Sequence, residues 1–181
     1  MTVHAEPRRE TVNRLGLWLF FCSEFFLFAA LFAARFYLAG PYHAKVNQPL
    51  GLAITLVLLV SGFTAYRAEA GIRRGDRSAF LRNLLVTILL GLVFLAGVGV
   101  EWATAEFAPS SIFGTAFFTM TGVHASHVLS GVVAFALAYR LGLRGHFSAE
   151  RHWGVEALVK YWYLIDVVWV FFFPVLYLVR A

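Results

Sequence analysis

The sequence has very little of what a water-soluble domain needs. Charged residues make up only 14% of its 181 positions, and Cys22 is the single cysteine. Soluble domains carry about 25% charged residues, so these charges are too few to cover the surface of a small soluble domain. A single cysteine in an apolar run also excludes a disulfide framework, a thiolate zinc site and an iron–sulfur cluster within this chain.

Apolar residues dominate what is present. They account for 60% of the chain, and Phe alone occurs 19 times. Five apolar segments are each close to the roughly 20 residues that a helix needs to cross a bilayer, and none alternates as a membrane strand does. We therefore expect an all-α integral membrane bundle of five transmembrane helices, with a polar N-terminal tail at 1–14 and one membrane domain at 15–181. The expected spans are about 15–38, 50–70, 84–104, 112–139 and 157–179.

The basic residues predict an orientation. Twelve of the fifteen Lys and Arg residues lie in or beside the N-terminal tail and the second-to-third and fourth-to-fifth connections. The other side has only Arg35, Lys45 and Arg180. Because basic residues accumulate on the cytoplasmic side of a membrane, the N-terminus is expected in the cytoplasm and the C-terminus outside. The net charge of +5 is then a topology signal with some affinity for anionic lipids, and no nucleic-acid partner is expected.

Four ionisable side chains fall well inside the apolar segments: Glu24, His124, His127 and Asp166. A charge inside a bilayer costs at least a few kcal/mol, so such a group usually faces the bundle interior and has a partner or a task. From a rise of about 1.5 Å per residue, Glu24, His124 and Asp166 are expected in one layer, with His127 one turn nearer the cytoplasm. The sequence therefore predicts a direct or water-bridged contact among the first three.

These residues also allow other roles. His124 and His127 share a helix face, which is compatible with a metal site, but the chain has too few membrane histidines to hold haem or copper. Trp162 and Trp169 share a helix face with Asp166. An indole N–H is therefore expected to donate a hydrogen bond to the Asp166 carboxyl.

The remaining acidic residues have simpler interpretations. Glu101 and Glu106 flank the outer end of the third span, where both are expected to be solvated. Glu156 and Lys160 are four residues apart with the acid first, an order that favours a pair on one helix. No activated nucleophile, phosphate-binding glycine loop or hydrolytic carboxylate pair is recognisable, so no catalytic residue is expected in this chain.

Several short motifs follow one another over nearly the whole chain. They are Ser23-Glu24, Glu101-Trp102, Thr121-Gly122-Val123-His124, His127-Val128 and Asp166-Val167-Val168-Trp169. In this order they resemble subunit III of the haem–copper cytochrome oxidases, in a five-helix form known from bacterial oxidases, whereas the common member has seven spans. The resemblance implies that five polar residues of these motifs are buried: Glu24, Glu101, His124, His127 and Asp166.

The resemblance implies an accessory subunit of a respiratory oxidase, without a redox centre of its own. This subunit is expected to pack against catalytic subunit I, in a complex that also contains subunit II and further subunits. The complex is expected in a bacterial inner membrane. Haem and copper are then expected in the partner subunits of a complex that oxidises cytochrome c, reduces oxygen and pumps protons. This subunit is expected to stabilise the core and maintain proton uptake. Phospholipid is a further expected ligand, with Arg144, His146 and His152 as candidate headgroup contacts. The alternatives are the accessory subunit of a quinol oxidase or of a nitric oxide reductase, and a small proton-coupled transporter.

Overall fold

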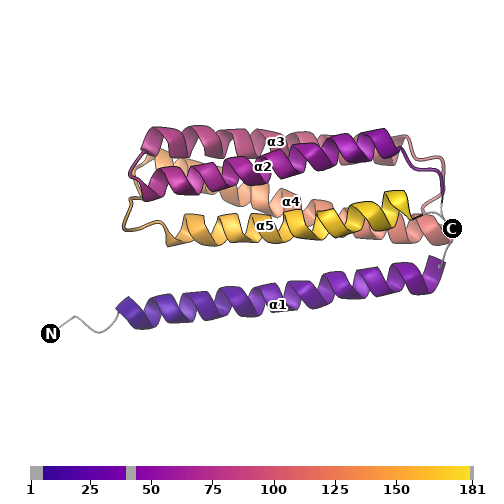
Figure 1. Cartoon of the computed structure of the whole chain (residues 1–181), viewed down its shortest axis with the longest axis horizontal. Helices are drawn as coiled ribbons and strands as arrows, with labels where there is room; N and C mark the ends of the chain where they lie inside the picture. Colours follow the sequence, from indigo (N-terminus) through magenta and orange to yellow (C-terminus); the bar gives the residue numbers. More distant parts are fainter. Residues whose placement is uncertain (1–5, 40–43, 180–181) are drawn as a thin grey trace.

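Five long helices make up the part of the chain that the computed structural model describes, residues 6–39 and 44–179, with side chains for 11–38 and 44–179 (Figure 1). Each is long and apolar enough to cross a membrane, and within these ranges there is no strand. The predicted all-α membrane bundle of five helices is confirmed. The elements are α1 (Glu6–Ala39), α2 (Gln48–Arg73), α3 (Arg77–Ala103), α4 (Ile112–Leu143) and α5 (Trp153–Phe173), which continues into a π-helical turn, η1 (Pro174–Leu178).

The helices extend beyond the apolar segments because polar side chains decide where most of them begin. Asn47, Asp76 and Ser111 precede α2, α3 and α4, and a side-chain oxygen of each accepts a hydrogen bond from a backbone N–H three residues later. Such N-caps satisfy donors that the first helical turn leaves unpaired. Accordingly α3 begins at Arg77 rather than at 84, and α1 already begins at Glu6, within the predicted tail.

Two glycines reverse the chain at one end of the bundle. Gly75 after α2 and Gly145 after α4 have φ angles of +75° and +74°, the left-handed conformation with which many helices end. α2 and α3 then approach so closely that a Cβ on Gly71 would lie 2.9 Å from the backbone nitrogen of Phe80. Glycine at this turn therefore allows the tight antiparallel pair α2–α3.

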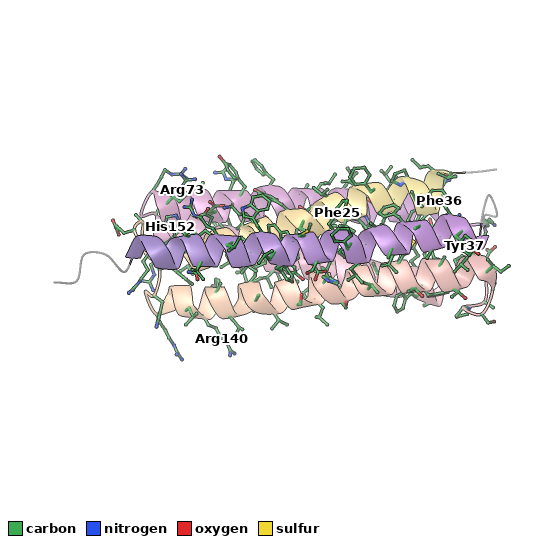
Figure 2. The ribbon with its side chains drawn as sticks, turned by 90° about the horizontal axis from the view of Figure 1, so that it is seen from below. Phe25, Phe36, Tyr37, Arg73, Arg140 and His152 are labelled. Carbon is green, nitrogen blue, oxygen red and sulfur yellow. The ribbon has the colours of Figure 1, made fainter. Side chains whose placement is uncertain are left out.

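Four of the helices form a closed ring, and α1 lies outside it. α2 packs against α3 and α5, α3 against α4, and α4 against α5, whereas α1 contacts α4 and α5. Figure 1 shows α1 set apart from the ring, and Figure 2, turned by 90°, shows it running along α4 and α5. Only 6% of the most apolar stretch of α1 is buried, against 44% in the last span. The attachment of α1 therefore depends on a small number of contacts.

Trp162 of α5 lies at the centre of the ring. Its side chain is fully buried, and its indole N–H donates to Oγ of Ser61 on α2 over 2.9 Å. Its ring also lies against Gly91 of α3 and Gly131 of α4, where an added Cβ would come within 3.1 Å and 2.6 Å of ring carbons. Small residues let membrane helices approach closely, so one tryptophan contacts all three other helices of the ring.

The two ends of the bundle differ in charge. Figure 2 shows Arg73, Arg140 and His152 at the end that carries the N-terminus, and Phe36 and Tyr37 toward the opposite end. We call these the amino-terminal end and the carboxyl-terminal end. The α2–α3 and α4–α5 connections lie at the amino-terminal end, and the α3–α4 connection lies at the carboxyl-terminal end.

Candidate functional site

A buried acid–base pair joins α1 to α4. Oε2 of Glu24 lies 2.9 Å from Nε2 of His127, and the two side chains are only 14% and 17% exposed. Nδ1 of His127 lies 2.7 Å from the backbone carbonyl of Val123, one turn earlier on α4. The ring of Phe28 covers the imidazole, with ring centroids 5.1 Å apart. The pair is thus one of the few contacts that hold α1 on the ring.

The two hydrogen bonds determine how many protons the pair holds. A carbonyl oxygen only accepts, so Nδ1 of His127 must carry a proton and donate it to Val123. Nε2 of His127 and Oε2 of Glu24 then need one further proton between them, because two facing lone pairs at 2.9 Å would repel. With that proton on either atom the pair has no net charge. The pair can therefore move a proton between acid and base without changing its total charge.

Hydroxyl groups and an open pocket adjoin this pair. Oγ of Ser130 and OH of Tyr161 lie 2.7 Å apart, and both hydroxyls are within hydrogen-bond distance of the His127 carbonyl. They line an open pocket of about 550 Å³ together with Phe20, Glu24 and His127. A water molecule occupies about 30 Å³ in the liquid, so this pocket has room for several waters beside the Glu24–His127 pair.

His124 takes no part in this pair. It is fully buried, and neither of its ring nitrogens has a hydrogen-bond partner. Its ring packs against Trp169, Phe94 and Phe172, with centroid distances of 4.7, 5.6 and 6.0 Å. His124 therefore behaves as an aromatic core residue rather than as a proton carrier.

The sequence predicts a contact among Glu24, His124 and Asp166. For direct hydrogen bonds of His124 this prediction is wrong, because neither of its ring nitrogens has a partner. Glu24 pairs with His127 instead, and Asp166 faces α2. The prediction used depth alone, whereas rotation about the helix axis decides which side chains meet. Residues three apart on a helix point about 60° away from each other, and this difference turns His127 toward α1 and His124 into the ring.

Replacement of His124 by Phe is expected to leave the free energy of unfolding unchanged or to raise it by up to about 1 kcal/mol. The reason is that a buried polar group without partners loses hydration and gains nothing, whereas an apolar ring of similar shape avoids that cost. Denaturant unfolding of the purified protein in detergent, followed by circular dichroism, measures the change. A loss of more than about 2 kcal/mol would show that the imidazole makes a polar interaction that this packing does not provide.

The two indoles beside Asp166 donate to α2 rather than to the carboxyl. Nε1 of Trp162 donates to Oγ of Ser61, and Nε1 of Trp169 donates to Oγ1 of Thr55, both over 2.9 Å. The predicted indole–carboxyl hydrogen bond is therefore wrong. Hydroxyl groups on the facing helix accept these bonds, and a sequence pattern within α5 cannot reveal them.

Asp166 itself lies against the backbone of α2. It is 7% exposed, and its Oδ1 has no hydrogen-bond partner. Its Oδ2 occupies the place that a Cβ on Gly62 would take. The absence of a side chain at Gly62 is what leaves room for this carboxyl between α2 and α5.

Glu101 is buried, which contradicts its expected solvation. It is 3% exposed, and its Oε2 accepts a hydrogen bond from the OH of Tyr177 over 2.5 Å. The side-chain amide of Gln48 donates to the Tyr177 carbonyl over 2.6 Å and so fixes η1 to the start of α2. Glu106 is exposed, as predicted, and forms an ion pair with Lys45 at 3.5 Å. The expected solvation of Glu101 is wrong because the sequence does not reveal that η1 covers it, whereas its burial agrees with what the family resemblance implies.

The predicted pair at the start of α5 is confirmed. Nζ of Lys160 donates to Oε1 of Glu156 over 2.5 Å. The ammonium also lies 5.5 Å from the ring centroid of Trp153, and the guanidinium of Arg14 on α1 lies 5.7 Å from the same ring. Cations at such distances are attracted to an indole, so this cluster adds a second attachment of α1 to the ring.

The metal alternative has little support from the two histidines. Both ring nitrogens of His127 are engaged in hydrogen bonds, and aromatic rings enclose His124. Among the side chains that the structure describes, no group of three His, Cys, Asp or Glu could hold a metal ion.

Sequence reasoning missed the hydroxyl partners of these polar residues. Ser130 and Tyr161 lie beside His127, and Tyr177 lies beside Glu101. The sequence places Tyr177 near the end of the last span, at the level where the third span ends, and this position could have indicated a contact with Glu101. Arg35 was counted as a flanking basic residue, but it is 1% exposed, with its guanidinium 5.0 Å from the Phe113 ring centroid.

Comparison with known proteins gives consistent matches. Residues 3–180 match the family described as cytochrome c oxidase subunit III. Cytochrome c oxidase subunit 3 of Cyprinus carpio is 35% identical over 188 residues, which cover 96% of this chain and 72% of the relative. The proteins of the same name from Dugong dugon and Scyliorhinus canicula are 35% and 34% identical, with the same coverage.

Proposed function

Since this chain belongs to the cytochrome c oxidase subunit III family, we propose that it stabilises the catalytic subunit of its complex and supplies protons through the Glu24–His127 pair. The chain is a non-catalytic accessory subunit of a haem–copper oxidase. The accessory subunits of a quinol oxidase or a nitric oxide reductase, and a small transporter, fit these matches less well. Electron transport from cytochrome c to oxygen is the activity that the complex serves.

The observation that carries the proposal is the arrangement of the acid–base pair beside a pocket with room for water. The pair holds one proton that can sit on either Glu24 or His127, and the pocket reaches both side chains. Ser130 and Tyr161 extend the polar surface by one helical turn toward the amino-terminal end. A proton that passes between the two partners creates no net charge inside the membrane, where an isolated charge is costly.

The orientation and location of the chain are part of the proposal. The amino-terminal end carries Arg73, Arg140 and His152, which supports placing that end in the cytoplasm. We place this multi-pass protein in a bacterial inner membrane, on the basis of its five-helix form. Arg144, His146 and His152 lie in or beside the α4–α5 connection, where they are available to anionic lipid headgroups.

Haem and copper are assigned to partner subunits, namely catalytic subunit I and subunit II. The two membrane histidines that the structure describes do not fit such groups, because His127 uses both ring nitrogens and His124 is enclosed by rings. The contribution of this chain is therefore packing, lipid binding and proton exchange at Glu24 and His127.

Replacement of Glu24 by Gln is expected to leave the haem spectrum of the purified complex unchanged and to slow proton uptake several-fold. Glutamine keeps a hydrogen bond to His127 but removes the group that exchanges the proton. Stopped-flow proton uptake and an optical spectrum of the same preparation measure the two effects. Loss of haem incorporation would contradict the proposed role.

Purification in mild detergent separates the proposal from the other classes of function. An oxidase subunit is expected to co-purify with a larger haem protein that oxidises cytochrome c. A transporter would instead purify alone or as a homo-oligomer and would move an ion in liposomes. Mass spectrometry of the partners, together with oxidation assays on cytochrome c and on a quinol, identifies the complex.

A further inference from the structure

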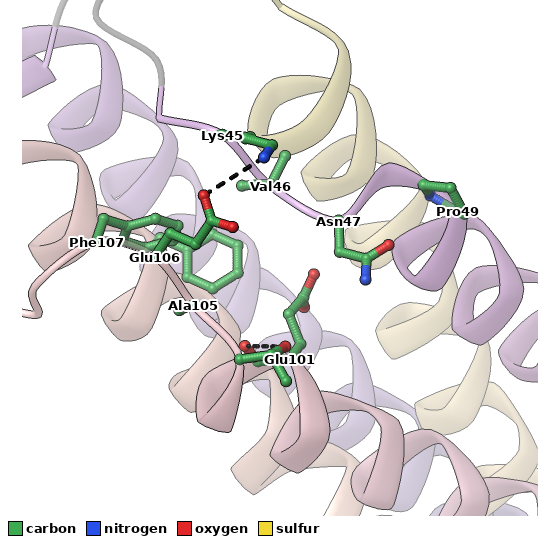
Figure 3. Close-up of a pocket in the computed structure, with 10 residues that line it drawn as sticks. Lys45, Val46, Asn47, Pro49, Glu101, Ala105, Glu106 and Phe107 are labelled. Carbon is green, nitrogen blue, oxygen red and sulfur yellow. Dashed lines mark hydrogen bonds and ion pairs between the residues drawn. The ribbon is translucent and has the colours of Figure 1, made fainter.

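A second pocket lies at the carboxyl-terminal end of the bundle, away from the Glu24–His127 pair. Its volume is about 440 Å³, and it is formed by the segment before α2, the end of α3 and the segment after α3. Figure 3 shows that Lys45 and Glu106 lie across one side of it, whereas Glu101 and Asn47 face one another across the interior. None of these residues belongs to the proposed proton-exchange site.

Glu101 provides the polar floor of this pocket. It is 3% exposed, and Oε2 accepts the hydrogen bond from Tyr177, whereas Oε1 has no hydrogen-bond partner. A carboxylate can accept about four hydrogen bonds, so one phenol leaves most of its capacity unused. A buried acceptor without a donor is costly. Figure 3 shows the carboxyl pointing into the pocket. A ligand in the pocket that donates a hydrogen bond to Oε1 would therefore remove this cost.

The charge of the lining favours a cation. Among the described residues that line the pocket, Glu101 and Glu106 are acidic, and Lys45 is the single basic residue. Lys45 is already engaged with Glu106 at 3.5 Å, and both side chains are largely exposed. Lys45 therefore neutralises Glu106 at the mouth, and the described residues of the lining provide no cationic partner for the buried Glu101 carboxyl.

The size and walls of the pocket distinguish an organic cation from a metal ion. A pocket of about 440 Å³ is far larger than a single ion needs and falls in the range of small-molecule sites. Calcium takes six to eight oxygen ligands, whereas the lining has two carboxylates. Phe107 and Phe117 line the same space, and aromatic rings attract ammonium groups. An ammonium with three N–H donors matches this combination.

We propose that the pocket around Glu101 binds a primary ammonium group, with the headgroup of phosphatidylethanolamine or a free alkylamine as its source. The ammonium donates to the Glu101 carboxyl between Phe107 and Phe117. In the lipid case the phosphate lies outside the mouth of the pocket. The pocket lies where α3 ends and α2 begins, the level at which lipid headgroups meet a membrane helix bundle.

The test uses the full chain in nanodiscs of defined composition. Native mass spectrometry is expected to show phosphatidylethanolamine retained about tenfold more strongly than phosphatidylcholine, whose quaternary ammonium has no N–H to donate. Glu101→Gln is expected to abolish this preference. Glu69→Gln, which changes a half-buried carboxyl near the opposite end, is the matched control and is expected to retain it.

Free ethanolamine distinguishes the two sources. Added to phosphatidylcholine nanodiscs, it raises the melting temperature of the wild-type chain, but not of Glu101→Gln, if the site takes a soluble amine. A lipid preference without this rise assigns the site to the lipid headgroup. Equal retention of the two lipids by the wild-type chain, with no effect of ethanolamine, overturns the proposal even if Glu101→Gln fails to fold. Retention of the preference by a folded Glu101→Gln overturns it as well.

Discussion

A His127→Leu replacement is expected to loosen α1 from the bundle and to lower the free energy of unfolding by roughly 2–3 kcal/mol. Glu24 would remain in a largely buried position without its hydrogen-bond partner, and breaking a buried pair from one side is costly for that reason. The value lies below the usual range of about 3–5 kcal/mol because both side chains keep some exposure. The effect concentrates on α1, since little else on this helix is buried.

Two measurements locate this effect. Denaturant unfolding in detergent gives the loss of stability, and hydrogen exchange shows whether the amides of α1 open before those of the ring. The combined replacement of Glu24 and His127 by Gln is expected to recover part of the loss, because two amides can hydrogen-bond without charge. His124→Phe, one turn away on α4, is the control. Uniform opening of all five helices would contradict a local role of the pair.

The second large effect is expected at the centre of the ring. A Trp162→Ala replacement should lower the free energy of unfolding by about 3–5 kcal/mol, the usual cost of emptying a buried tryptophan site. The indole contacts three helices and donates to Ser61, and no rearrangement of Gly91 or Gly131 can fill the space because neither has a side chain. Loss of the indole also leaves the Ser61 hydroxyl without its donor.

A size exchange makes this prediction specific. Gly131→Leu alone is expected to be severely destabilising, because its Cβ would overlap the Trp162 ring. Combined with Trp162→Ala, the new side chain enters the vacated space, so the double variant should be more stable than the sum of the two single effects predicts. Unfolding curves of the three variants under one set of conditions give the coupling. Strict additivity would show that α4 and α5 do not pack as described.

The sequence predicts those features that depend on a single helix. Length and hydropathy identify the five spans, and the spacing of Glu156 and Lys160 gives a pair that the structure contains. The motifs identify the family through residues such as Glu24 and His127. These properties follow from local order along the chain, so no knowledge of helix packing is needed.

The sequence fails where two helices must be placed against each other. The hydrogen bonds of Trp162 and Trp169 go to hydroxyls on α2, and the acid that meets α4 pairs with His127 rather than with His124. Depth along a helix can be counted from the sequence, but rotation about its axis is set by neighbouring side chains. The partner of Glu101 was missed for the same reason, because Tyr177 reaches it from the end of another helix.

The wide turn η1 sets the angular phase of the last residues of the chain. Pro174 has no N–H to continue the α-helical pattern, and the N–H of Val179 bonds the Pro174 carbonyl five residues back. The buried positions Phe172 and Tyr177 are accordingly five residues apart, a spacing that a regular α-helix would rotate off the inner face. A one-residue deletion within 174–176 would leave four residues from Phe172 to the tyrosine, a spacing that a regular α-helix keeps on one face, whereas a one-residue insertion would turn the phenol away from Glu101. Insertions and deletions near this end are constrained by helical phase more strongly than by length.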